Sequence, residues 1–340
     1  MGKHEREDVY IAEKILNDLL NGVKVNKNHR KHKLFDCANS LAKRIKQDFP
    51  DMQESTHIGN IYGSSIGNIK LILKNGEKIY LELKFLESGV GTRANIGQDS
   101  LTDFHLFKGK NILSWSDFRG IKKHNEWVQT ELNKYKDYPT EIESIEGDSA
   151  IYEKAGYLKK VLSVMNQTAI TVAEEVLSNP ASSHEELAAA KIVKKIVERD
   201  REEKLEYISY LKTLTQDHEK IKKFLFLILA GSHTHASLEE HWNVDLPEIL
   251  ETLRHKYYVY YVYKKTLETK VEDYSKRLKN LLDKQISISF MEKQTNVLLS
   301  FTDNTGNKIP ILRIVFHWKN KFQGIQTPCL NIFDDRYLKE

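Results

Sequence analysis

The fold of this chain is decided by residues 68–85, which read NIKLILKNGEKIYLELKF. Two runs of alternating apolar and polar residues flank Asn75-Gly76, a pair typical of a tight β-hairpin turn. The apolar residues that share a face have odd numbers in both runs. If both apolar faces enter one core, an odd-numbered residue must lie opposite another odd-numbered residue, so the two numbers have an even sum. A two-residue Asn75-Gly76 loop would give an odd sum, so the sequence predicts a three-residue loop or a bulge.

The same parity places Glu82 and Lys84 on one face of the hairpin, and Asn68 joins them from the partner strand. Hard divalent cations such as Mg²⁺ take carboxylate oxygens as ligands, together with water and phosphate. A lysine ammonium can orient the attacking water or offset charge that builds on the phosphate. The arrangement therefore suits metal-assisted phosphodiester hydrolysis. The alternative is an exposed strand face on which Glu82 and Lys84 are merely solvated.

The hairpin resembles the catalytic core of the PD-(D/E)xK nuclease superfamily, especially type II restriction endonucleases, over about residues 55–105. In that family an acidic residue begins one hairpin strand, and the (D/E)-x-K triplet ends the next. Glu82-Leu83-Lys84 matches the triplet, and the position of the first acid falls on Asn68. The resemblance implies that Asn68, Glu82 and Lys84 are the catalytic residues. It also implies that Asn68 and Glu82 are ligands of a Mg²⁺ cofactor.

Asn68 is a departure from the family pattern. A neutral amide binds Mg²⁺ more weakly than a carboxylate, so a site with Asn68 in the place of the acid should be impaired. One explanation is that an aspartate at this position was replaced to trap a substrate complex. The other is that a carboxylate elsewhere supplies the charge, from Glu54, Glu87 or Asp99. The otherwise intact hairpin favours the replacement.

A glycine-bearing loop follows the catalytic strand, over residues 87–98, and we expect it to open a helix at about residues 97–107. A helix N-terminus after a catalytic strand suits a phosphate group. We therefore predict three DNA-binding residues: Arg93 as a phosphate clamp, and Asn95 and Gln98 as hydrogen-bonding groups for backbone or bases. A glycine-rich connector without such a role explains the segment equally well.

The composition is that of an ordinary globular protein of 340 residues, with 52 Lys and Arg and a net charge of only +4. A DNA-binding face must therefore be a local patch. Cys37 and Cys329 lack metal-ligand spacing, and two thiols fit a reducing cytoplasm. The sequence shows no targeting segment, no apolar run long enough to span a bilayer and no Walker A motif. We expect a cytoplasmic protein without a membrane anchor or a nucleotide cofactor.

The patterns predict an α+β fold in three regions. Residues 1–140 form a restriction-endonuclease-like core, with a mixed β-sheet flanked by helices over about 8–21 and 31–49. Residues 141–283 form a large helical region, and residues 284–340 form a C-terminal antiparallel sheet that is expected to contact DNA.

Two further segments bear on function. The tyrosine-rich stretch 255–265 is interpreted as a helix packed between two elements, and base stacking by its rings is the alternative. Three histidines lie close together at His233, His235 and His241, but their spacing matches no zinc motif, so we expect no zinc site there.

Together these patterns predict a type II restriction endonuclease, which uses Mg²⁺ to hydrolyse double-stranded DNA at specific sequences. If Asn68 stands in place of a catalytic aspartate, this chain is an inactivated form of such an enzyme. The alternatives are a non-catalytic DNA-binding protein and a repair-type nuclease of the same superfamily. The chain carries one Glu-x-Lys hairpin of this kind, so cutting both strands of a palindromic duplex suggests a homodimer. Closure of the helical region around the duplex as an arm is the other possibility.

Overall fold

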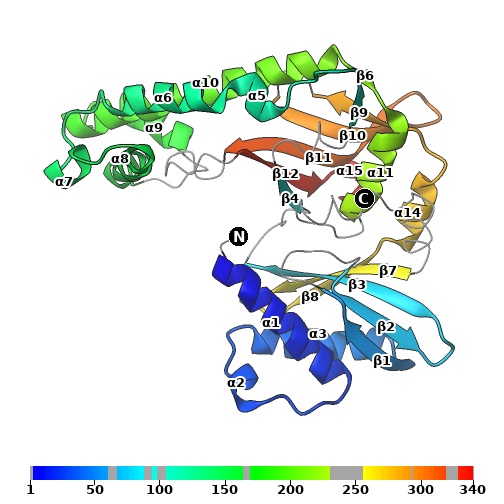
Figure 1. Ribbon diagram of the computed structural model, residues 1–340. Helices are drawn as coiled ribbons and strands as arrows, with labels where there is room; N and C mark the ends of the chain where they lie inside the picture. Colours follow the sequence, from blue (N-terminus) through cyan, green and yellow to red (C-terminus); the bar gives the residue numbers. More distant parts are fainter. Residues whose placement is uncertain are drawn as a thin grey trace.

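The computed structural model shows an α+β protein with two five-stranded sheets and a long helical extension (Figure 1). It describes residues 3–59, 67–87, 94–97, 105–163, 169–229, 256–291, 294–318 and 328–339. The predicted mixed sheet flanked by helices and the separate C-terminal antiparallel sheet are both confirmed.

The first sheet is mixed. In spatial order its strands are β1 (Met52–His57), β2 (Ile69–Leu73), β3 (Lys78–Leu86), β7 (Lys256–Tyr263) and β8 (Thr269–Asp273). Strands β3 and β7 run parallel, whereas the other neighbours are antiparallel. A parallel pair needs a long crossover, and here that crossover contains the second sheet's β4 and all the helices of the extension.

The β2–β3 hairpin has the register that parity requires. Ile69 lies opposite Leu81 and Leu71 lies opposite Ile79. The Leu73 N–H donates to the Glu77 carbonyl over 2.9 Å, which closes a loop of three residues, and Gly76 at its end adopts a φ of +81°. A left-handed residue after a tight turn is the usual form of a three-residue hairpin loop. The predicted loop length is therefore confirmed.

Three N-terminal helices precede the first sheet: α1 (Lys3–Leu20), α2 (Lys27–Arg30) and α3 (Phe35–Asp48). Helices α1 and α3 pack on each other, and their apolar stripes bury the face of the sheet that carries Leu81 and Leu83. The predicted helices over about 8–21 and 31–49 are confirmed in place, with ends that differ by a few residues.

The second sheet is antiparallel. Its strands, in spatial order, are β4 (Ala94–Gly97), β12 (Pro328–Asp334), β11 (Lys308–Trp318), β10 (Asn296–Thr302) and β9 (Ile286–Phe290). Four of them come from the predicted C-terminal segment, whereas β4 is contributed by the segment that follows β3.

A shared core joins the two sheets. It contains Val259 and Tyr80 from the first sheet, the inner residues of the second sheet and the fully buried run Phe224–Leu229. The Tyr274 hydroxyl, at the start of α14 (Ser275–Leu281), donates to Asp334 Oδ2 on β12 over 2.9 Å. Tyr274 directly follows β8, so this buried hydrogen bond connects the end of the first sheet to the second sheet. A short helix, α15 (Arg336–Lys339), follows β12.

The helical extension reaches away from both sheets across the top of Figure 1. Its helices are α5 (Trp115–Arg119), α6 (Ile121–Leu132), α7 (Thr140–Glu143), α8 (Asp148–Val161), α9 (Ala169–Ser178) and α10 (His184–Lys212). We call α6–α10 the arm. Ser183 and Glu186 form a capping box at the N-terminus of α10. The short strands β5 (Phe107–Lys108) and β6 (Thr215–Gln216) pair at its base, and α11 (His218–Leu229) returns the chain to the core.

A buried set of charges holds the base of the arm together, and we call it the arm charge cluster: Arg119, His124, Asp200, Glu203 and Lys204. Arg119 Nη1 lies 3.0 Å from Asp200 Oδ1, and its Nε lies 2.5 Å from Glu203 Oε2. Lys204 Nζ lies 2.7 Å from Asp200 Oδ2. The cluster therefore links the α5–α6 junction to the middle of α10.

Two predictions of secondary structure are wrong. The segment 256–273, placed in the helical region 141–283, forms β7 and β8 of the first sheet. Strand β7 is buried on both faces, and such a strand is apolar without alternation, so its sequence resembles that of a buried helix. The helix predicted at about 97–107 is wrong at both ends, where Gly97 belongs to β4 and Phe107 to β5. Residues 98–104 lie outside the described residues, as do His233, His235 and His241.

Candidate active site

Glu82 and Lys84 lie together at the end of β3, on the face opposite the buried leucines. Lys84 Nζ is 2.6 Å from Glu82 Oε1. Only 2% of the Glu82 side chain and 17% of the Lys84 side chain are exposed. Since Leu81 and Leu83 pack on α1 and α3, the strand's alternation directs the Glu-x-Lys pair to the other side of the sheet.

Asn68 is fixed next to this pair by backbone geometry. Its N–H donates to the Leu81 carbonyl over 2.7 Å, and its Oδ1 accepts the N–H of Leu83, also over 2.7 Å. It stands one residue before Ile69, whose partner is Leu81, so the register brings it level with Glu82. Gly67 makes the approach possible, because it has a φ of +74° and a Cβ there would stand 2.9 Å from the Leu81 carbonyl oxygen.

A second buried carboxylate, Glu13 of α1, lies at the same end of the sheet. Glu13 Oε2 is 2.9 Å from Nε2 of His57, the last residue of β1. Glu13 Oε2 and Asn68 Nδ2 lie 2.6 Å and 3.3 Å from the point where a Cβ would stand on Gly59. The amide of Asn68 therefore sits between the Glu13–His57 pair and the backbone of β3. A side chain at position 59 would therefore require the Glu13 carboxylate to move.

Electrostatics connect Glu13 to the Glu-x-Lys pair. The pKa of Glu13 is raised, chiefly because burial disfavours its charged form. The hydrogen bond from His57 opposes that rise, the negative charge of Glu82 adds to it and the positive charge of Lys84 reduces it. We call Glu13, His57, Asn68, Glu82 and Lys84 the hairpin-end cluster. Two buried carboxylates that interact electrostatically are typical of sites that bind cations or transfer protons.

Sequence reasoning missed Glu13 and His57. A signal for Glu13 was present, since an acid at this position falls within the apolar stripe formed by Ala12, Ile15 and Leu16. Nothing in the sequence around His57 indicates a partner on α1, because their contact depends on how α1 packs on the sheet.

The carboxylates suggested as substitutes for the missing acid lie elsewhere. Glu54 is exposed in the middle of β1. Glu87 is 65% exposed, and its Oε1 lies 2.9 Å from Lys264 Nζ. Asp99 falls outside the described residues. Among the acidic residues that the structure describes, Glu13 is the one that lies near Asn68 in addition to Glu82.

Of the predicted DNA-binding residues, Arg93 and Gln98 lie outside the described residues. Asn95 lies on β4, where its Cα is paired with that of Asn331 on β12. The segment that follows β3 thus reaches the edge strand of the second sheet within about ten residues. Arg93, Asn95 and Gln98 are the residues concerned. Their role in DNA binding stays a prediction.

The hairpin-end cluster offers a small donor set for a metal. Within the described part of the chain, no three His, Cys, Asp or Glu side chains are grouped closely enough to hold an ion among themselves. Mg²⁺ does not need such a cage, since it is commonly held by one or two carboxylates and completes its shell with water and substrate phosphate. Glu82 and Glu13 are the carboxylates that would take this role, because both are buried and the negative charge of Glu82 adds to the rise in the pKa of Glu13 that burial mainly causes.

Comparison with known proteins adds no family to this geometry: no family model matches the chain, and no curated protein or solved structure does. None of the helices that the structure describes is both long enough and apolar enough to cross a membrane.

Proposed function

We propose that this protein is a metal-dependent nuclease that hydrolyses phosphodiester bonds of double-stranded DNA at the hairpin-end cluster. The observation that carries the proposal is the burial of Glu82 against Lys84, on a rigid strand and at the same end of the sheet as Glu13 and Asn68. A buried carboxylate destabilises the fold unless it is compensated, so a cluster of this kind is more readily explained by chemistry than by stability.

In this proposal Glu82 and Glu13 hold Mg²⁺, which when bound supplies a water of lowered pKa and charge stabilisation for the phosphate. Lys84 donates a hydrogen bond from its ammonium to the attacking water or to a phosphate oxygen. The apolar wall of Leu81 and Leu83 behind the strand keeps both groups in place. His57 holds the Glu13 carboxylate in position through the bond of 2.9 Å.

Asn68 sets the level of activity. Its Oδ1 already accepts the Leu83 N–H, and an aspartate could keep that bond while it placed a second oxygen where Nδ2 now faces Glu13. A carboxylate there would bind a hard cation more strongly than the amide does. The present sequence is therefore proposed to be a weak or inactive form, and Asn68→Asp a more active one.

The test is digestion of supercoiled plasmid with Mg²⁺ by the protein and by its Asn68→Asp variant. The proposal predicts cleavage by Asn68→Asp, and its loss when Glu82→Gln or Lys84→Ala is added. Lys78→Ala is the matched control, because Lys78 is an exposed lysine at the other end of the same strand. If Asn68→Asp cuts no form of DNA, the protein is better described as a DNA-binding module.

The cut pattern separates the remaining alternatives. Discrete fragments would identify a type II restriction endonuclease, whereas cleavage confined to damaged or branched DNA would identify a repair-type nuclease. In the restriction enzyme a twofold dimer would deliver one site to each strand. Light scattering of the protein with and without cognate duplex tests that assembly.

A further inference from the structure

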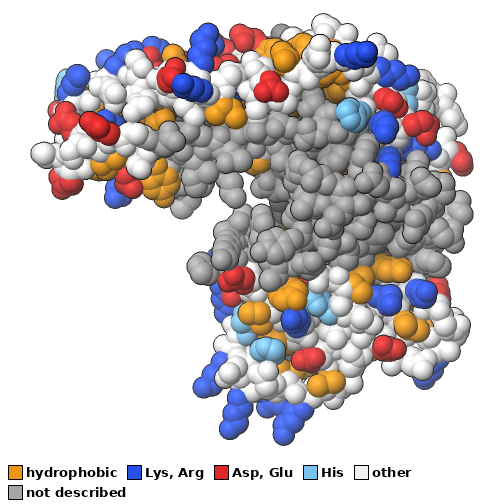
Figure 2. Space-filling model, viewed as in Figure 1, with side chains coloured by type: hydrophobic (Ala, Val, Ile, Leu, Met, Phe, Trp, Pro, Cys, Tyr) orange, Lys and Arg blue, Asp and Glu red, His pale blue; other side chains and the backbone are white. Residues whose placement is uncertain are grey.

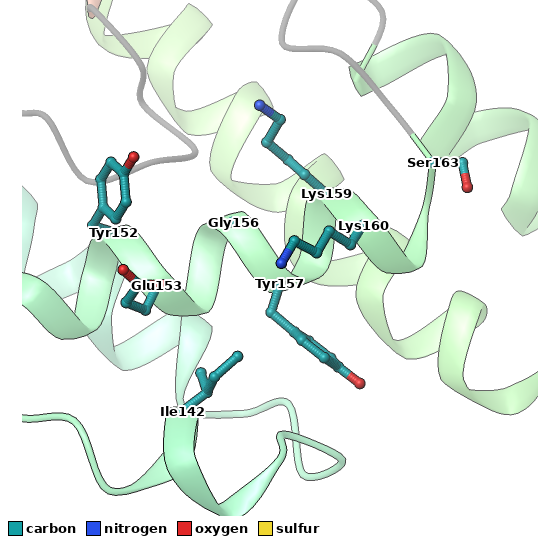
Figure 3. A pocket seen from close by; sticks show the side chains of 8 residues that line it. All are labelled: Ile142, Tyr152, Glu153, Gly156, Tyr157, Lys159, Lys160 and Ser163. Carbon is teal, nitrogen blue, oxygen red and sulfur yellow. The ribbon is translucent and has the colours of Figure 1, made fainter.

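A pocket of about 480 Å³ lies on α8, near the far end of the arm. Helix α8 buries Ile151, Ala155 and Leu158 against the other arm helices, and the pocket lies on its outer side, next to α7. Figure 3 shows the residues that line it: Ile142, Tyr152, Glu153, Gly156, Tyr157, Lys159, Lys160 and Ser163.

The lining is basic and aromatic. Lys159 and Lys160 contribute two positive charges against the single negative charge of Glu153. Tyr152 is 41% exposed, and it is one of four exposed large hydrophobic residues in the part of the chain that the structure describes. Ammonium groups neutralise phosphates, and aromatic rings pack on sugars and bases, so this combination fits a nucleic acid.

Gly156 forms the floor of the pocket and has no structural reason to be glycine. It lies in the interior of α8, and a Cβ there would meet nothing within 4 Å. Alanine would therefore fit and would favour the helix, because glycine is a poor helix former. The bare backbone leaves room for a ligand to approach the helix closely.

The arm helix α8 borders an open side of the molecule. Figure 2 shows a hollow between the arm and the lower part of the molecule, and Figure 1 shows α8 on the side of α10 that borders it. With its 29 residues, α10 is about 44 Å long, which corresponds to about 13 base pairs of B-form DNA. A duplex of about 13 base pairs is therefore as long as α10.

We infer that the α8 pocket is a second contact for double-stranded DNA, which grips the sugar-phosphate backbone at a distance from the cleavage site. The inference rests on the proposed function, since it takes DNA as the substrate. It assigns Lys159 and Lys160 to phosphates, Tyr152 to a sugar or base, and Gly156 to the close approach of the backbone.

The experiment measures binding by fluorescence anisotropy without Mg²⁺, so that cleavage plays no part, using duplexes of about 8 and about 30 base pairs. The long duplex should bind the unmodified protein at least tenfold more tightly than the short one. Lys159→Gln/Lys160→Gln should remove most of that gain and lower the slope of log affinity against log salt by about 2. Lys122→Gln/Lys191→Gln is the charge-matched control, because both lysines are exposed arm residues outside the pocket.

Gly156→Ala gives the sharpest test, since it should raise the Tm by about 2 °C and yet weaken binding of the long duplex several-fold. Unchanged long-duplex binding in both pocket variants would overturn the α8 contact and leave the nuclease proposal intact. An unmodified protein that binds neither duplex would overturn the α8 contact and the proposed function together.

Discussion

The hairpin-end cluster and the arm charge cluster are both buried groups of charged side chains, but they are compensated differently. In the arm, Asp200 and Glu203 face the permanent cations Arg119 and Lys204, and Arg199 Nε adds a contact of 2.8 Å to Glu203. At the hairpin end, Lys84 pairs with Glu82 and His57 pairs with Glu13, and the positive charge of Lys84 also acts on Glu13.

The pKa shifts reflect this difference. Burial alone would raise the pKa of Glu203, but the hydrogen bond from His124 and the charge of Arg119 outweigh it, and the pKa is lowered. Burial raises the pKa of Glu13, and the neighbouring carboxylate of Glu82 adds to the rise. A compensated cluster holds helices together, whereas an excess of buried carboxylate is suited to bind a cation.

Breaking the arm charge cluster should have the largest effect on stability. Arg119→Met leaves Asp200 and Glu203 buried without their shared guanidinium, and we expect a loss of about 3–5 kcal/mol in the free energy of unfolding. Denaturant unfolding followed by circular dichroism measures it. A loss below about 1 kcal/mol would mean that the cluster is not a structural anchor.

A glycine pair tests how tightly the hairpin end is built. Gly67→Ala should cost about 2–3 kcal/mol, because a Cβ would strain a left-handed residue and press on the Leu81 carbonyl. Gly76→Ala is the control, with a φ of +81° and nothing within 4 Å of a Cβ, and it should cost only about 1 kcal/mol. Equal losses would show that the contact with Leu81 contributes nothing. The same denaturant titrations decide between these outcomes.

The smallest effect is the pH dependence of Glu13→Gln. Because the pKa of Glu13 is raised in the folded protein, its contribution to stability is fully present below the ordinary value of 4.5 and is lost as the pH rises through the folded value. Glutamine lacks that loss, so the variant should gain stability relative to the unmodified protein as the pH rises. Glu203→Gln should show the opposite trend, because the pKa of Glu203 is lowered. Thermal unfolding from about pH 2.5 to about pH 8 compares the two variants, because the Glu203 trend falls below that group's ordinary value of 4.5. Parallel curves would remove the distinction between the clusters.

The sequence predicted what depends on neighbouring residues. Parity and Asn75-Gly76 predicted the register and loop of the hairpin, and the apolar periodicity predicted α1 and α3. Prediction from the sequence failed where the structure of a segment depends on contacts with residues far away in the chain. The run Lys256–Tyr263 is a strand because it pairs with β3, and its many aromatic and β-branched residues were a signal that its unbroken apolar character concealed. The contact of Glu13 with His57 needs α1 to be docked on the sheet.

The most direct test of the account is the thermal stabilisation of the Asn68→Asp variant by Mg²⁺. A cation that binds the folded protein alone raises the Tm with its concentration. We expect millimolar Mg²⁺ to raise the Tm of Asn68→Asp, Glu82→Gln to abolish the rise, and Glu203→Gln in the arm charge cluster to leave it unchanged. A rise that survives Glu82→Gln, or no rise in Asn68→Asp at all, would contradict a cation site at the hairpin end.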